Sequence, residues 1–190
     1  AMSGSARSID TVQDDSLLKL AKKQRMNTPL RRTIFCLLLG SEDYMDAFEK
    51  LSKLNLKGKQ DREIVFVLMH CLLMEKTYNK YYELIAIKLC TFDYNMKFTF
   101  QYHLWDKFKQ VERLKVRELT LLADFVAGLI GSGALSLSLL KVIHFESLTP
   151  RLIFMCKRLF SNLLCGRAPA GRNVHRSPPS EEGVAPLFHR

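Results

Sequence analysis

The sequence lacks the features that mark most membrane, secreted and metal-binding proteins. No apolar run approaches the roughly 20 residues that a membrane-spanning helix needs, and no apolar segment of a signal peptide follows the N-terminus. The five cysteines form no C-x-x-C pair, the spacing of many zinc and redox sites. Because they are odd in number and lie mostly in apolar helical patterns, we expect reduced core thiols in an intracellular protein.

Catalytic signatures are equally scarce. The chain has no glycine-rich phosphate-binding loop, nucleophile elbow or paired-carboxylate motif. No histidine has a second histidine four residues away, as a zinc-binding helix requires. We therefore expect no enzyme activity, no cofactor and no metal site. The histidines are interpreted as satisfied core or surface side chains: His70, His103, His144, His175 and His189.

Proline and alternating strand patterns are rare before residue 165. Only Pro29 and Pro150 occur there, each after a threonine, which predicts a helix start with a threonine cap and proline in the first turn. Elsewhere, apolar residues recur at steps of three and four, the helical period. This pattern predicts about eight helices joined by short connections, and pairs of helices recur about every 35–40 residues along the chain. The predicted fold is all-α, a HEAT-like stack of antiparallel helical hairpins, or α-solenoid.

Residues 61–92 are the stretch around which we expect this stack to form. They predict two helices joined at residues 75–77, with Asp61 and Thr77 as helix caps. Both helices carry apolar residues on more than one side, so they need cover from several neighbours and belong in the middle. Before them, Ser41 is the predicted cap of a helix whose first turn holds Glu42 and Asp43.

The charge is unevenly distributed along the chain. The net charge is +10, and residues 19–32, the basic segment, hold six cations and no acid. Residues 1–25 are expected to be a tag remnant and a flexible basic arm, and residues 26–165 the helical domain. Residues 166–190 hold four of the six prolines and are expected to be a disordered Pro/Gly/Arg-rich tail.

Several segments resemble the MA-3 domain, a HEAT-like module of translation initiation factor 4G and its relatives. The similarity lies in the run that begins at Leu30, in Ser41, Asp43, Ala47 and Leu51, and in the segment that begins at Glu75. The resemblance covers about residues 26–164 and is closest to a nucleolar subfamily whose members also carry a 4G-type middle domain. It implies a nuclear and nucleolar adaptor that binds a DEAD-box RNA helicase of the initiation-factor-4A type and acts in small-subunit ribosomal RNA maturation.

Three groups of residues are candidate contact sites. The first group, which we call the acidic edge, is a candidate site for binding basic residues of the helicase. The second group, which we call the central joint, is a candidate because joints at the edge of a solenoid often carry contacts. Each group also has a purely structural interpretation: the acidic edge would compensate the dipole at the start of its helix, and the central joint would be a turn. The acidic edge is Glu42, Asp43, Asp46 and Glu49; the central joint is Glu75, Lys76, Tyr78 and Asn79.

The basic segment is the third candidate. Its cations are Lys19, Lys22, Lys23, Arg25, Arg31 and Arg32. They suit either phosphate contacts of RNA or a nuclear targeting element, and a solvated arm is the alternative. The segment lacks interleaved aromatic residues on which single-stranded bases stack. Besides the helicase adaptor, two functions therefore remain open: a direct RNA-binding module, and a scaffold for other pre-ribosomal proteins.

Overall fold

Both threonine–proline pairs begin helices as predicted. In the computed structural model, which describes residues 15–56 and 58–166, Thr28 Oγ1 accepts a hydrogen bond from the Arg31 amide at 3.2 Å. Thr149 Oγ1 accepts one from the Leu152 amide at 3.3 Å. The prolines that follow are the first residues of their helices, where no amide donor is needed.

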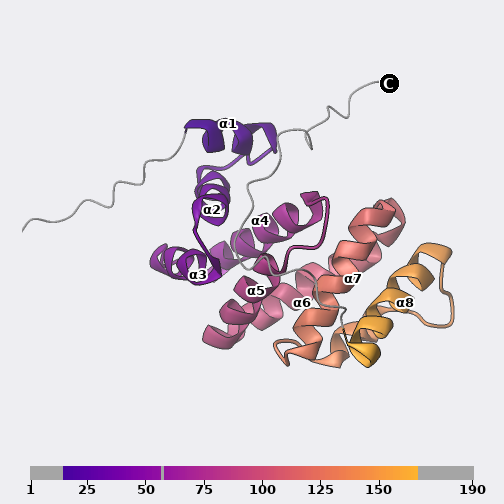
Figure 1. Ribbon diagram of the computed structural model, residues 1–190. Helices are drawn as coiled ribbons and strands as arrows, with labels where there is room; N and C mark the ends of the chain where they lie inside the picture. The colour runs from indigo at the N-terminus through magenta and orange to yellow at the C-terminus, as the bar shows by residue number, and fades with distance from the viewer. Residues whose placement is uncertain (1–14, 57, 167–190) are drawn as a thin grey trace, which may run out of the picture.

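The described residues form eight α-helices and three short 3-10 helices, with no strand among them (Figure 1). The α-helices are α1 Asp15–Lys23, α2 Pro29–Gly40, α3 Tyr44–Lys53, α4 Asp61–Met74, α5 Lys80–Phe92, α6 Tyr94–Lys109, α7 Val116–Gly131 and α8 Pro150–Cys165. The 3-10 helices are η1 Gly58–Gln60, η2 Val111–Arg113 and η3 Leu137–Val142. The predicted all-α class is confirmed.

The helices stack in chain order from α1 at one end to α8 at the other (Figure 1). Helix α2 packs against α4, α3 against α5, α4 against α6 and α5 against α7. Contacts between helices two positions apart are those of stacked hairpins, so the expected HEAT-like arrangement is confirmed. Helix α8 closes the stack through an extensive interface with α7.

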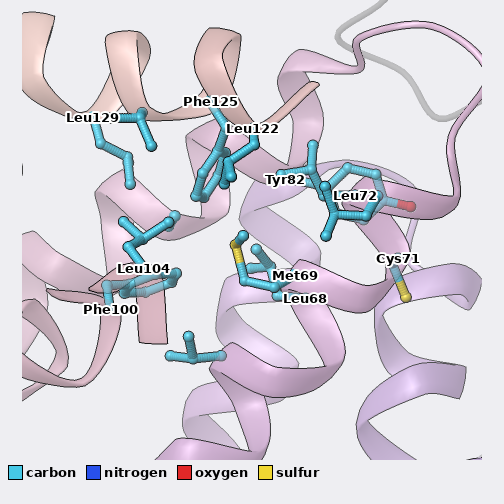
Figure 2. Close-up of a cluster of buried hydrophobic side chains, with 14 of the residues drawn as sticks. Leu68, Met69, Cys71, Leu72, Tyr82, Phe100, Leu104, Leu122, Phe125 and Leu129 are labelled. Atoms are coloured by element: carbon cyan, nitrogen blue, oxygen red, sulfur yellow. The ribbon is translucent and has the colours of Figure 1, made fainter. Parts of the chain in front are cut away.

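Helix α4 lies in the middle of the core, as its sequence predicts. Its side chains are buried on most sides, and α2, α6 and α7 cover them. Figure 2 shows Leu68 and Met69 of α4 beside Phe100 of α6 and Phe125 of α7. In the described part of the chain, none of the helices combines the length and the apolar character that crossing a membrane requires.

Several helix starts differ from the prediction because a better cap lies nearby. Asp43, not Ser41, caps α3, and the Ser41 hydroxyl instead donates to the Leu37 carbonyl at 2.6 Å. Asn79, not Thr77, caps α5 by accepting from the Tyr81 amide at 3.0 Å. Asp61 is the first residue of α4 rather than its cap. Asp and Asn compete well with Ser and Thr as caps, so the pattern alone does not choose between neighbours.

The packed structure begins earlier than the predicted boundary at residue 26. Helix α1 lies against α2, its Ala21 is fully buried, and Leu17 and Leu20 pack against the core. Residues 15–25 are therefore not a flexible arm, because three apolar side chains hold them to the domain. Residues 1–14 of the expected arm and residues 167–190 of the expected tail lie outside the described residues.

All five cysteines except Cys165 are buried. Burial raises the pKa of Cys90 to about 12 and also raises that of Cys156. A protonated thiol is a poor nucleophile, so these two side chains act as small core residues rather than as reactive groups.

Candidate partner-binding surfaces

The acidic edge lies at the start of α3, and its four carboxylates play different parts. Asp43 Oδ1 accepts from the amides of Met45 and Asp46, both at 2.8 Å, which holds the first turn in place. Asp46 accepts from the Glu42 amide at 3.0 Å and from Lys50 Nζ at 2.6 Å. Half of the acidic edge therefore builds the helix end on which it lies.

Burial alone would raise the pKa of Asp46, but hydrogen bonds from Lys50 and from the Glu42 amide outweigh it. The pKa therefore lies below its ordinary value, and the carboxyl group is ionised at neutral pH. The exposed members are Glu42 and Glu49, although Lys53 Nζ lies 3.9 Å from Glu49. These two carboxylates are the part of the edge that a basic partner reaches most easily.

The central joint is held by hydrogen bonds that the sequence did not reveal. The Tyr82 hydroxyl donates to Glu75 Oε1 at 3.0 Å, and the Tyr78 hydroxyl donates to the buried carboxylate of Glu83. Asn79 caps α5. Among the four predicted residues of the joint, only Lys76 has an exposed side chain. The joint is therefore mainly a structural element.

The acidic edge and the central joint do not form one cluster. Phe48, next to Glu49, packs its ring against Phe92 with the centroids 5.5 Å apart. Phe92 is the last residue of α5, whereas the joint precedes its first residue. A helix of this length extends roughly 20 Å. The Glu49 end of the acidic edge therefore lies about one helix length from the joint.

The basic segment divides into an exposed and a structural part. Lys19, Lys22, Lys23 and Arg25 are exposed on α1 and just after it. Arg31 is instead paired with Glu63, to which its Nη2 donates at 3.3 Å.

The Arg31 guanidinium also lies 3.9 Å from the centroid of the Phe66 ring, so it joins α2 to α4. Arg32 donates to the carbonyls of Asn27 and Thr28, both at 3.4 Å. These two arginines help to fix the fold and are less available to a partner.

A partly open cleft of about 250 Å³, which the sequence did not predict, lies between α4, α6 and the start of α7. It is lined by Phe66, His70, Leu73, Met74, His103, Lys107, Leu114 and Glu118. His103 Nε2 is buried there and has no hydrogen-bond partner among the described residues. His103 is therefore not the satisfied histidine that we expected.

The two histidines of the cleft are neutral at pH 7. Burial and the nearby charge of Lys107 lower the pKa of His103 to about 4, and the same causes lower the pKa of His70. The described residues contain no group of three or more His, Cys, Asp or Glu side chains that could hold a metal ion. The cleft thus offers neutral imidazoles, the cation of Lys107 and the carboxyl group of Glu118 beside apolar walls.

His103 makes stability depend on pH. Its pKa rises from about 4 in the folded chain to an ordinary value of 6.5 on unfolding, so acid favours the unfolded state. We expect the free energy of unfolding to fall as the pH drops from about 6.5 towards 4, with His103 contributing on the order of 2–3 kcal/mol. Urea unfolding at several pH values measures this loss.

The His103→Gln variant should lose less stability over this pH range than the original chain does. His144→Gln is the control, because that ring is exposed. If the stability of His103→Gln depended on pH as strongly as that of the original chain, the assignment of this pH dependence to His103 would be wrong.

Comparison with known proteins identifies the family of the chain. The model of the MA3 domain matches residues 30–136. The chain is 50% identical over 144 residues to the human nucleolar MIF4G domain-containing protein 1, and 40% identical over 150 residues to its homologue in Drosophila melanogaster. These alignments cover 75% and 79% of this chain, but only 17% of each relative.

A third relative is the suppressor of glycerol defect protein 1 of Schizosaccharomyces pombe. It is 35% identical over 174 residues, which is 87% of this chain and 22% of the relative. The nuclear and nucleolar location expected from the sequence agrees with the names of the human and fly proteins. The predicted resemblance is confirmed, and the chain belongs to the MA3-domain family.

Proposed function

We propose that this domain is a non-catalytic adaptor that binds a DEAD-box RNA helicase of the initiation-factor-4A type during nucleolar processing of ribosomal RNA for the small subunit. The observation that carries the proposal is the acidic edge, where the exposed Glu42 and Glu49 flank two carboxylates fixed by helix-capping and ion-pair contacts. A rigid group of negative charges suits a basic surface on a partner. Membership of the MA3 family and nucleolar relatives support the same function.

The adaptor would act by favouring one arrangement of the two lobes of the helicase. A ligand shifts such an equilibrium only by the difference between its affinities for the two states. Binding should therefore differ between the helicase alone and the helicase with nucleotide and RNA. No chemical step by the domain is required.

A titration of the chain with the helicase, with and without nucleotide and RNA, tests this proposal. The variants to compare are Glu42→Lys, Glu49→Lys and their combination, because these side chains are exposed. Asp43 and Asp46 are poorer choices, since their replacement would also disturb α3. We expect the double variant to weaken binding by about tenfold or more, mainly through slower association.

Glu146→Lys is the matched control, because it reverses an exposed charge in the segment before α8. It should leave the affinity unchanged, and helical circular dichroism should be the same in all variants. If no helicase state binds at about 100 µM, a range in which even weak complexes are detected, the adaptor proposal fails for this domain. Equal loss in Glu146→Lys would exclude the acidic edge as the specific contact.

A second candidate, direct RNA binding through the basic segment, is favoured by the exposed cations of α1, which are Lys19, Lys22 and Lys23. Affinity that rests on phosphate contacts falls steeply with salt, whereas a protein interface with an apolar centre is less sensitive. Measuring both affinities over a range of salt concentrations separates the two candidates.

A further inference from the structure

Helix α6 carries a row of aromatic side chains on its outer side. Tyr94, Phe98, Tyr102 and Trp105 follow one another at steps of four, four and three, which places them along one side of a helix. Tyr94 is 67% exposed, Phe98 42% and Tyr102 58%, while Trp105 is partly buried. We call these four residues the aromatic face. The core side of α6 is separate and consists of Met96, Phe100, Leu104 and Phe108.

The rings of the aromatic face are arranged as two edge-to-face pairs. The centroids of Tyr94 and Phe98 are 5.1 Å apart, and those of Tyr102 and Trp105 are 5.5 Å apart. The rings within each pair are nearly perpendicular, at 88° and 85°. With a rise of 1.5 Å per residue the row is roughly 16 Å long, enough for several stacked nucleotides.

Two lysines accompany these rings. Lys97 Nζ lies 5.7 Å from the centroid of Tyr94, and Lys141 Nζ of η3 lies 5.1 Å from that of Trp105. The indole of Trp105 is fixed, because Nε1 donates to the Leu139 carbonyl at 2.8 Å. Neither lysine makes an ion pair within the part of the chain that the structure describes.

The carboxylate that precedes α6 and the one on α6 are already engaged. Asp93 caps the helix by accepting from the Asn95 amide at 2.8 Å, and Asp106 lies 3.6 Å from Lys109. The aromatic face therefore has cations whose charge is not neutralised by ion pairs. The exposed part of the basic segment differs from the aromatic face, because residues 19–25 include cations but no aromatic residue.

Exposed rings interleaved with cations match single-stranded nucleic acid better than they match a protein. Bases of any sequence stack on aromatic side chains, and lysines hold the phosphates between them. Protein interfaces also use aromatic residues, but lysine is depleted there. Exposed rings of this number on one helix are costly in water, which points to an occupant.

We propose that the aromatic face of α6, together with Lys97 and Lys141, binds single-stranded RNA. Bases stack on the exposed rings of Tyr94, Phe98 and Tyr102, and the two lysines contact the phosphates. This site does not depend on the helicase proposal, since the acidic edge lies on α3 and carries the opposite charge. An adaptor with both surfaces would hold the helicase and a strand of RNA at the same time.

Trp105 provides a direct test, because it is the only tryptophan of the chain. The full chain is titrated with oligouridine of about 12 nucleotides, a length within the usual site sizes. Trp105 fluorescence and the anisotropy of labelled RNA are followed together. We expect saturable quenching of Trp105 and weaker binding of an RNA duplex, whose bases are not free to stack.

Variants then locate the site. Tyr94→Ala/Tyr102→Ala should weaken binding by roughly 25-fold or more, since each lost stack costs at least about fivefold, and Tyr94→Phe/Tyr102→Phe should bind as the original chain does. Ile153→Ala/Phe154→Ala is the matched control, because both side chains are exposed on α8. Lys97→Gln/Lys141→Gln should reduce the salt dependence of binding.

Three results would overturn the proposal. The first is that oligouridine does not bind, or binds without any change in Trp105 fluorescence. The second is that only the Lys19→Gln/Lys22→Gln/Lys23→Gln variant loses binding, which would assign RNA to α1. The third is that Tyr94→Ala/Tyr102→Ala keeps its RNA affinity but loses the helicase, which would make the aromatic face a protein interface.

Discussion

Replacing Gly128 by alanine is expected to destabilise the domain by about 2–4 kcal/mol, although alanine favours a helix by about 1 kcal/mol. A Cβ atom at this position of α7 would lie far inside contact distance of the Glu83 carboxyl group. Glu83 is only 5% exposed and accepts the Tyr78 hydroxyl. Moving this carboxyl group would therefore disturb a buried polar side chain and its hydrogen-bond partner together.

The chain offers a matched control in Gly131, also in α7, where an added Cβ meets nothing within 4 Å. Gly131→Ala should leave the free energy of unfolding unchanged or slightly raised. In a Glu83→Ala background, Gly128→Ala should cost much less, so the two changes should not be additive. Urea unfolding of the original chain, the two single variants and the Gly128→Ala/Glu83→Ala double variant measures this coupling. Additive effects would show that the close approach of Gly128 to Glu83 is unimportant.

Signals that lie within a few residues allowed the fold to be predicted. Thr28 and Thr149 cap helices because each is followed at once by proline, and the apolar period of three and four located the α-helices from α2 to α8. The period did not locate α1, since residues 15–25 were expected to be part of a flexible arm, and residues 137–142, which are also rich in apolar side chains, form a 3-10 helix. Local choices between neighbouring caps were less certain, as Asn79 and Asp43 show.

The candidate surfaces were harder to predict because they depend on contacts between distant residues. Arg31 belongs to a basic run in the sequence, but Glu63, 32 residues later, pairs with it. Similarly, the position of the joint was predicted, but not the bonds from Tyr78 to Glu83 and from Tyr82 to Glu75. The aromatic face was missed because the exposure of Tyr94, Phe98 and Tyr102 depends on packing, which the spacing of residues along the chain does not show.

The second large effect is expected at the interface between α7 and α8, where Arg158→Met should destabilise the domain by about 2–4 kcal/mol. Arg158 donates to both oxygens of Asp124, at 2.7 and 3.0 Å, and Asn162 donates to the same carboxylate at 2.6 Å. The hydrogen bond to Asp124 also raises the pKa of Arg158. Because the Asp124 side chain is 3% exposed, losing the cation leaves a charge buried.

This cost lies below that of a fully buried pair, because the Arg158 side chain is 46% exposed and water screens part of the interaction. Lys157→Met is the control, since it removes the same charge from an exposed neighbouring position and should change stability by less than about 0.5 kcal/mol. Urea unfolding followed by circular dichroism measures both variants.

The reactivity of Cys156 reports separately on α8. This buried thiol lies on α8, and burial raises its pKa, so a thiol reagent should modify it slowly while α8 is packed on α7. In Arg158→Met the rate should rise, because α8 detaches more often, whereas in Lys157→Met it should not. A loss of stability without faster modification of Cys156 would mean that Asp124 supports the core of α7 rather than the attachment of α8.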